Sequence, residues 1–207
     1  VRILCRHMAA ERRFFMKKII AINASPHKDG DVAFLLKTAL SKLSEKGFDT
    51  ELIYLQSALD SAKTPFCVCC SSPCSKACYK GTALEDVLNK MEDADGIIFG
   101  TPVYFGAMTA QLKCLFDKTR DARSRRAFVG KTGCVFTSGA SLFGGQEATV
   151  RSVQDAMLVD GFTIIGTSSE KLGAGHMGVC SLRPAREDKN ALSRIDLICE
   201  RFAEEVK

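Results

Sequence analysis

The stretch KKIIAINASPHKDGD, residues 17–31, decides the fold of this 207-residue chain. Its first half is a short, nearly continuous apolar run, which predicts a buried β-strand over residues 17–23. Its second half is a polar turn, after which apolar residues recur at helical spacing over residues 33–46 and stop at Gly47. A strand, a turn and a helix that ends at glycine predict the first part of a βαβ unit.

The same alternation of strand and helix continues to the end of the chain. Apolar runs predict strands over residues 50–55, 96–100, 132–137 and 162–166, and apolar periodicity predicts helices over residues 83–94, 110–122, 146–160 and 190–206. Such alternation predicts an α/β protein whose parallel sheet is covered on both faces. Five strands favour a doubly wound, flavodoxin-like sheet of order 2-1-3-4-5 over a six-stranded dinucleotide fold.

A cysteine-rich segment, residues 65–81 (PFCVCCSSPCSKACYKG), interrupts this pattern as a loop excursion. Four of its cysteines read as C-x2-C-x3-C-x3-C, and four thiolates are the usual ligands of an iron–sulfur cluster. Zinc also takes four thiolates, but commonly as two pairs with a long spacer between them. A disulfide framework is the third option, and it is disfavoured because the chain shows no secretory signal.

Composition and charge narrow the class of protein further. Hydrophobic residues make up 46% of the chain, charged residues 26%, and the formal net charge is +5. We expect one domain over residues 16–207, preceded by an N-terminal extension, residues 1–15, outside the fold. No basic patch is interleaved with aromatic residues and no apolar run is long enough to span a membrane, so neither nucleic acid nor membrane is an expected partner. Ten cysteines without a secretory signal predict the reducing cytoplasm.

The loops that follow the strands are the expected place for a ligand, because doubly wound sheets bind beyond the carboxyl ends of their strands. Residues 23–31 form a small polar loop that leads into a helix, and a helix N-terminus favours an anion. Ser25, His27 and Lys28 would add side-chain donors. The loop has no G-x-G-x-x-G and no Walker lysine, so no dinucleotide or triphosphate is indicated. An ordinary strand-to-helix turn remains the alternative.

Two more loops lie at the same expected edge. Residues 101–108 carry the adjacent rings of Tyr104 and Phe105, which cannot both face inward and therefore need a flat ligand or another subunit as a partner. Residues 137–147 are rich in glycine and hydroxyl groups, so the backbone can approach a ligand closely. Three such loops suit a flat heterocycle with a single phosphate, which is flavin mononucleotide (FMN).

At three places the chain resembles a known family. GTPVYFGAMTAQLKCLFDKT (residues 100–119), INASPHKDG (22–30) and TSGASLFGGQE (137–147) are similar to the flavin loops of the NADPH-dependent FMN reductase superfamily, which is flavodoxin-like. The cysteine-rich segment lies where the iron–sulfur flavoprotein branch carries its cysteine motif. The resemblance implies FMN, a four-iron, four-sulfur cluster, NAD(P)H as a possible electron donor, and a homodimer or homotetramer in which the flavin of one subunit lies near the cluster of another.

Site residues follow from that resemblance. The implied flavin contacts are Ser25, His27, Asp31, Thr101, Pro102, Val103, Tyr104, Phe105, Gly106, Thr137, Ser138, Gly139 and Gly144. The implied cluster ligands are Cys67, Cys70, Cys74 and Cys78, with Cys69 as a spare or substitute. Asp31 and Val32 stand where the family usually has Asn-Thr, so capping of the following helix is the alternative role for Asp31. No side chain is identified as a catalytic acid, base or nucleophile, in keeping with flavin chemistry.

Three functions remain open at this point. The first is a redox flavoprotein that passes electrons between a four-iron, four-sulfur cluster and FMN. The second is an NAD(P)H-dependent FMN or quinone reductase without a cluster, its cysteines vestigial or bound to zinc. The third is a non-enzymatic metal- or redox-sensing module on a flavodoxin scaffold. Iron, zinc and flavin contents distinguish the three.

Overall fold

The fold is built on one parallel sheet, as the alternating sequence pattern predicts. The structure is a computed structural model that describes residues 16–170 and 173–206, so the predicted extension at residues 1–15 lies outside the described part. The strand order is β2-β1-β3-β4-β5, which confirms the predicted order, and β6 also pairs with β4. The strands are β1 Lys18–Asn23, β2 Asp49–Tyr54, β3 Gly96–Pro102, β4 Thr132–Gly139, β5 Thr163–Ile164 and β6 Val179–Leu182.

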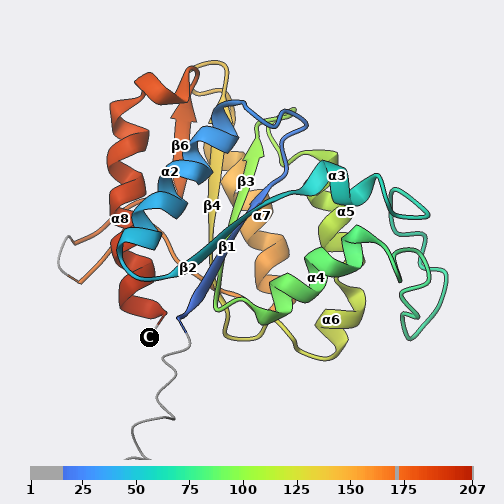
Figure 1. Cartoon of the computed structure of the whole chain (residues 1–207). Coiled ribbons are helices and arrows are strands. Elements are labelled where there is room, and N and C mark those ends of the chain that lie inside the picture. Colours follow the sequence, from blue (N-terminus) through green and yellow to red (C-terminus); the bar gives the residue numbers. More distant parts are fainter. Residues whose placement is uncertain (1–15, 171–172, 207) are drawn as a thin grey trace, which may run out of the picture.

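Helices cover both faces of the sheet. On one side lie α2 (Asp31–Glu45) and α8 (Lys189–Glu205), as Figure 1 shows at the left. On the other side lie α3 (Leu55–Leu59), α4 (Ala83–Asp93), α5 (Ala110–Lys118), α6 (Arg120–Ser124) and α7 (Gln146–Asp160). A short 3-10 helix, η1 (Ala185–Glu187), precedes α8.

Alternating side chains of the strands supply two separate cores. In β1, Ile19 and Ala21 pack toward α2 and α8, whereas Ile20 and Ile22 pack toward the helices of the opposite face. Because both of their faces are buried, the inner strands β1 and β3 carry continuous apolar runs rather than an apolar–polar alternation. In β3, a Cβ atom at Gly100 would lie 2.6 Å from Leu36 Cδ1, so glycine lets α2 pack directly on the sheet.

The fifth strand position differs from the prediction. The strand expected over residues 162–166 is shorter: it is β5, which has only two residues and pairs with Thr132 and Gly133 of β4. The other half of β4 pairs with β6, which the sequence did not indicate. The chain turns out of the sheet after β5: the Thr167 N–H donates to the His176 carbonyl at 2.8 Å, which closes the excursion before β6.

A second difference concerns the helix expected over residues 110–122, which is two helices that meet at Thr119. The Thr119 hydroxyl lies 2.7 Å from the Phe116 carbonyl and 3.0 Å from Asp160 Oδ1 on α7. This junction faces the cysteine-rich segment, residues 65–81, which connects α3 to α4 without a helix or strand and extends away from the sheet (Figure 1, right).

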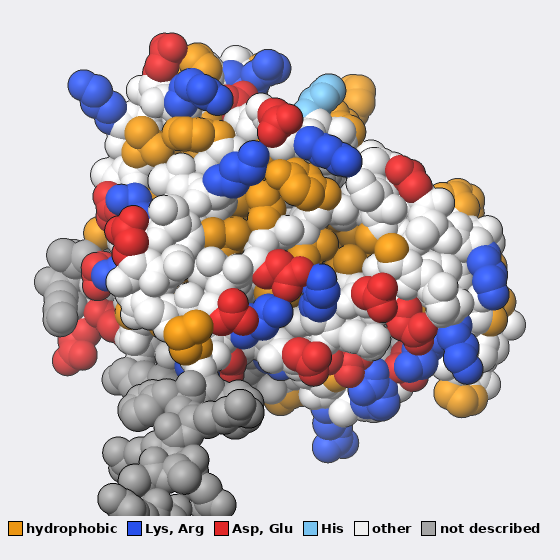
Figure 2. Space-filling view, in the orientation of Figure 1, with side chains coloured by type: hydrophobic (Ala, Val, Ile, Leu, Met, Phe, Trp, Pro, Cys, Tyr) orange, Lys and Arg blue, Asp and Glu red, His pale blue; other side chains and the backbone are white. Residues whose placement is uncertain are grey.

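The surface mixes charges of both signs. Acidic and basic side chains lie next to one another over the lower part of the face drawn in Figure 2, with apolar side chains exposed between them nearer the middle. Within the described residues, no helix is both long and apolar enough to cross a bilayer.

Candidate cofactor site and cysteine segment

Three loops meet at the carboxyl edge of the sheet. The first two are joined because the Ala24 N–H donates to the Gly100 carbonyl at 2.8 Å and the Thr109 hydroxyl donates to the Ala24 carbonyl at 2.9 Å. The second and third are joined by a bond from the Val103 N–H to the Ser138 carbonyl at 3.0 Å. The loops that the sequence singles out therefore form one continuous surface.

The first loop holds its shape through its own polar side chains. Asn23 Oδ1 accepts the Ser25 N–H at 2.9 Å, and Ser25 Oγ accepts the His27 N–H at 3.1 Å. The Nδ2 group of Asn23 is buried and has no hydrogen-bond partner among the described residues. Within the described residues, no side chain caps the N-terminus of α2, so the first N–H groups of the helix remain available to an anion.

Asp31 does not have the alternative role predicted for it, and its contact with the flavin stays a prediction. Its side chain does not cap α2; instead Oδ1 accepts the Ala185 N–H at 2.8 Å and Oδ2 pairs with Arg183 Nε at 3.1 Å. The carboxylate is thus already bound to the segment before α8. The pairing also brings a guanidinium group close to the first loop, which the sequence did not reveal.

The second loop presents two rings to solvent. Tyr104 and Ala107 exchange two backbone hydrogen bonds at 3.0 and 3.1 Å, and the residues between them, Phe105 and Gly106, have φ of 51° and 74°. Positive φ at both central positions defines a tight turn that suits glycine and strains phenylalanine. The Phe105 ring is fully exposed at the tip, and Tyr104 is 43% exposed. Thr101, by contrast, is buried, and its hydroxyl accepts the Thr109 N–H at 3.0 Å.

The third loop combines unsatisfied hydroxyl groups with a tight turn. Thr137 Oγ1 and Ser138 Oγ are buried and have no partner within residues 16–170 and 173–206. The turn closes through a bond from the Gly144 N–H to the Ser141 carbonyl at 3.1 Å, and a Cβ atom at Gly144 would lie only 2.6 Å from that carbonyl oxygen. Phe143, inside the turn, is 95% exposed.

These residues fit a flat ligand that carries an anionic group. Buried polar atoms normally have hydrogen-bond partners, and three of them lack one at the ends of β1 and β4, next to open N–H groups and exposed rings. Pro102, Val103, Gly106 and Gly139 line or support the same loops. A separate hollow of about 870 Å³ lies beyond the third loop, lined among others by Phe143, Ser181 and Arg183. The sheet order reverses at the three loops, which therefore remain the predicted flavin site.

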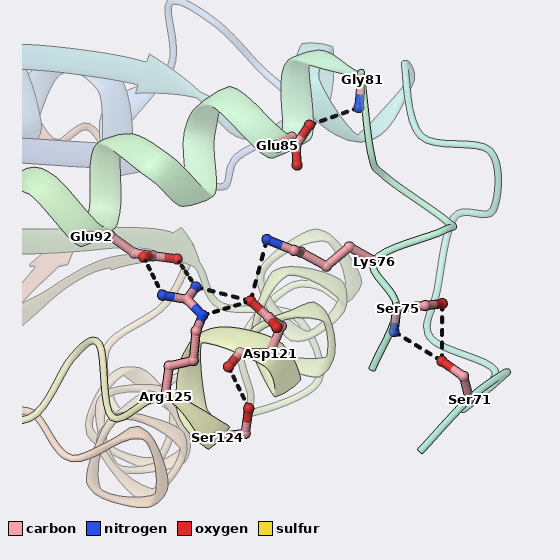
Figure 3. A network of polar contacts seen from close by, with 9 residues as sticks. All are labelled: Ser71, Ser75, Lys76, Gly81, Glu85, Glu92, Asp121, Ser124 and Arg125. Carbon is pink, nitrogen blue, oxygen red and sulfur yellow. Dashed lines mark hydrogen bonds and ion pairs between the residues drawn. The ribbon is translucent and has the colours of Figure 1, made fainter. Parts of the chain in front are cut away.

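The cysteine-rich segment is tied down at both ends. The Lys63 N–H donates to the Cys78 carbonyl at 2.9 Å, and the Gly81 N–H donates to Glu85 of α4 at 2.8 Å. Figure 3 shows a further anchor: Lys76 reaches Asp121 at 3.5 Å, and Asp121 also binds Arg125, which pairs with Glu92. The segment is therefore fixed against α4 and α6 although it has no regular secondary structure.

All five thiols of the segment reach solvent at least in part. Cys69 and Cys70 are exposed, and the Cys69 N–H donates to Cys67 Sγ at 3.4 Å. Among the described residues, no three His, Cys, Asp or Glu side chains converge on a common point as metal ligands would. The donor set, with four accessible thiols at the expected positions, fits a soft metal centre chemically, and the ligand assignment remains a prediction.

Positive groups of the α5–α6 junction face these thiols. Arg120 donates to the Ser71 carbonyl at 3.4 Å, and its contact with Cys67, followed by the charges of Cys69 and Cys74, raises the pKa of its guanidinium. Lys118, at the end of α5, is 1% exposed, and its Nζ lies 3.4 Å from Cys78 Sγ. The sequence pattern did not single out Lys118, although its spacing of three residues from the buried Leu115 was an available signal.

A hollow of about 660 Å³ separates Cys67 from α7 and contains a buried acid at its edge, Asp160. Asp160 Oδ2 has no partner in the described chain, and burial raises the pKa of the carboxyl to about 6, against the opposing hydrogen bond from Thr119. The native state therefore holds this proton more tightly than the unfolded chain does.

Asp160→Asn is expected to stabilise the protein at high pH only. As pH rises from about 4 to about 6, the Asp160 carboxyl loses its proton in the unfolded chain before it does so in the native protein. The free energy of unfolding therefore falls over this range and stays low above it. Asparagine removes this loss, so urea unfolding should give a gain of about 1–2 kcal/mol at pH 8 and almost none at pH 4. Asp155→Asn, on the exposed rim of the same hollow, is the control. An equal gain at both pH values would contradict the assignment.

Comparison with known proteins agrees with the fold and the loops. The sequence model of the NADPH-dependent FMN reductase family matches residues 17–170. An iron–sulfur flavoprotein of Methanocaldococcus jannaschii is 35% identical over 164 residues, which are 78% of this chain and 82% of that protein. An NAD(P)H dehydrogenase (quinone) of Methanosarcina mazei is 46% identical over 82 residues, 40% of this chain and 38% of its own.

Solved structures show the same architecture at low identity. A flavodoxin, WrbA-like protein from Agrobacterium tumefaciens superposes with a TM-score of 0.66 over 93% of this chain and 100% of its own, at 16% sequence identity. The chain belongs to the NADPH-dependent FMN reductase family, in its iron–sulfur flavoprotein branch, and is a flavin oxidoreductase. The resemblance inferred from the three loops is thereby confirmed.

Proposed function

We propose that this protein is an electron-transfer flavoprotein that binds FMN at the three loops and a four-iron, four-sulfur cluster at the cysteine-rich segment. The main observation in favour is that one chain contains two sets of groups suited to the two cofactors. Buried polar atoms without partners lie at the flavin loops, and accessible thiols lie beside the positively charged junction of α5 and α6. The similarity to an iron–sulfur flavoprotein over most of the chain supports it.

Each of the three loops would contact a different part of FMN. The open N–H groups of α2 and the first loop, with Ser25 and His27, would bind the phosphate. Asn23 Nδ2, Thr137 Oγ1 and Ser138 Oγ would donate to or accept from the polar edge of the ligand, which gives these buried atoms partners. The exposed rings of Tyr104 and Phe105 would cover the flat ring and exclude water from one face.

The chemistry itself belongs to the cofactors: a flavin exchanges electrons in pairs or singly, and an iron–sulfur cluster exchanges them singly. In the proposed centre, Cys67, Cys70, Cys74 and Cys78 supply the thiolates. Arg120 and Lys118 offset the negative charge of the four sulfur atoms from the α5–α6 side. No side chain of the described residues is assigned a proton-transfer role here.

Self-association of two or four copies completes the proposal. Phe105 and Phe143 at the flavin loops, and Phe66 and Val68 in the cysteine-rich segment, are more than half exposed. Covering these apolar side chains against a second copy would stabilise an oligomer and shorten the electron path between subunits. NAD(P)H as donor and the reducing cytoplasm as location remain predictions.

The test is an anaerobic absorption spectrum with iron, zinc and FMN quantified on the same sample. The proposal expects about four irons and one FMN per chain. FMN without iron would replace it by the alternative, a plain NAD(P)H-dependent FMN or quinone reductase, which the local 46% identity to a quinone dehydrogenase favours. A colourless protein that cannot be reconstituted with FMN would overturn both.

Asp31→Asn is expected to tighten FMN binding about threefold to tenfold at low salt. The substitution removes a carboxylate from the N-terminus of α2 and frees Arg183 for the phosphate, while an amide oxygen can still accept the Ala185 N–H. Fluorescence titration of the FMN-free protein measures the dissociation constant. Asp29→Asn is the control, since Asp29 is exposed and pairs with Lys37. An effect that is equal at low and high salt would contradict an electrostatic cause.

A further inference from the structure

Lys118 is a buried lysine, and burying a lysine costs free energy. Its side chain is 1% exposed and stands among the largest fully buried side chains of the described protein. Lysine is almost never fully buried unless its ammonium group is paired, because removing the charge from water costs several kcal/mol. Its burial therefore requires a partner that carries or accepts charge.

The partner that the structure provides is sulfur. Lys118 Nζ donates to Cys78 Sγ at 3.4 Å, and among the described residues this is the hydrogen bond recorded for the ammonium group. A neutral thiol is a weak acceptor, whereas a thiolate carries a full negative charge. Cys78 also differs from its neighbours because it packs against the core of the α4–α5 face, whereas Cys69 and Cys70 are exposed.

We propose that Lys118 is the positioning residue of the cysteine centre: its buried ammonium group fixes the sulfur of Cys78 and places a positive charge beside the bound cluster. The inference rests on the proposed function and deepens it, because it names the residue that sets the properties of that centre. Lys118 is the last residue of α5, so it reaches the cysteine-rich segment from the end of that helix that lies away from the second flavin loop.

The sign of the effect follows from electrostatics. Reduction adds an electron to a centre of four thiolates, and a nearby positive charge in a poorly solvated position favours that step. Loss of the charge is therefore expected to make the cluster harder to reduce. Arg120, at the exposed side of the same junction, is more strongly screened by solvent and should contribute less.

Lys118→Met keeps the length of the side chain and removes the charge. In an anaerobic redox titration of the reconstituted protein, we expect the ratio of reduced to oxidised cluster at a fixed potential to fall about tenfold, which is about 59 mV for a one-electron couple. Lys118→Arg should restore the wild-type ratio to within about threefold. Lys113→Met is the matched control on the same helix: Lys113 is exposed and paired with Asp117, so the ratio should not change.

A second readout uses protein without iron. Removing the buried ammonium group also removes the cost of taking its charge out of water, so metal-free Lys118→Met should melt at or above the wild-type temperature while losing iron faster when loaded. A merely structural lysine predicts the opposite: a lower melting temperature and an unchanged cluster potential, and that result overturns the inference. Loss of iron in both Lys118→Met and Lys118→Arg would also overturn it, because shape rather than charge would then matter. Absence of iron from the wild type would instead refute the proposed function itself.

Discussion

Cys74→Ala is expected to lower the iron content from about four atoms per chain to less than one, because it removes one of four thiolates and leaves no adjacent cysteine to take its place. The FMN content should stay at the wild-type value, since the cysteine-rich segment lies apart from the three flavin loops along the chain. Iron and flavin assays after anaerobic reconstitution measure both quantities on one sample.

The control for this experiment is Cys69→Ala in the same exposed stretch. Cys69 is the predicted spare thiol, so its removal should leave the iron content unchanged. If Cys69→Ala loses iron and Cys70→Ala retains it, the second ligand is Cys69 and the C-x2-C reading is wrong. Full iron content in Cys74→Ala would refute a cluster held by this segment.

Gly144→Ala is expected to weaken FMN binding at least tenfold, or about 1.4 kcal/mol. The added Cβ would lie 2.6 Å from the Ser141 carbonyl oxygen, and a backbone atom cannot move away as the end of a flexible side chain can. The turn that closes the third loop would have to open, carrying Phe143 with it. Fluorescence titration with FMN measures the change.

The comparison variant is Gly139→Ala. Its Cβ would meet the amide group of Gln146, whose Nε2 donates to the Ser141 carbonyl at 2.9 Å, so the clash would cost the loop one side-chain hydrogen bond but would not displace its backbone. Without bound metal or flavin, the Gly144→Ala and Gly139→Ala variants should both melt within a few degrees of the wild type, because the loop is at the surface. A wild-type FMN affinity in Gly144→Ala would show that the turn does not shape the flavin site.

Most of the fold was predictable because strands that are buried on both faces appear in the sequence as short apolar runs. Residues 19–22 and 96–100 are uninterrupted runs without polar side chains, and their order along the chain, with helices between, leaves few topologies. β6 was not predictable, because VCSL is short and half polar and pairs with the far half of β4 only after an excursion. The break at Thr119 was hidden inside a continuous helical pattern.

For the candidate site, the sequence predicted the loops but not their long-range partners. Topology alone brings residues 23–31, 101–108 and 137–147 to one edge of the sheet. The binding of Asp31 to Ala185 joins residues 154 positions apart, and no local pattern reports such a contact. Lys118 was missed because a lysine in a sequence normally indicates exposure, and only the packing of α5 against the cysteine-rich segment reverses that expectation.

The divided strand at the end of the sheet protects the protein against edge-to-edge aggregation. A long unpaired edge strand is a template on which a foreign strand can add. Beyond β4, a foreign strand would find only two residues of β5 or four of β6, separated by a turn of the chain out of the plane. Fibril-like growth is therefore disfavoured on this side of the sheet.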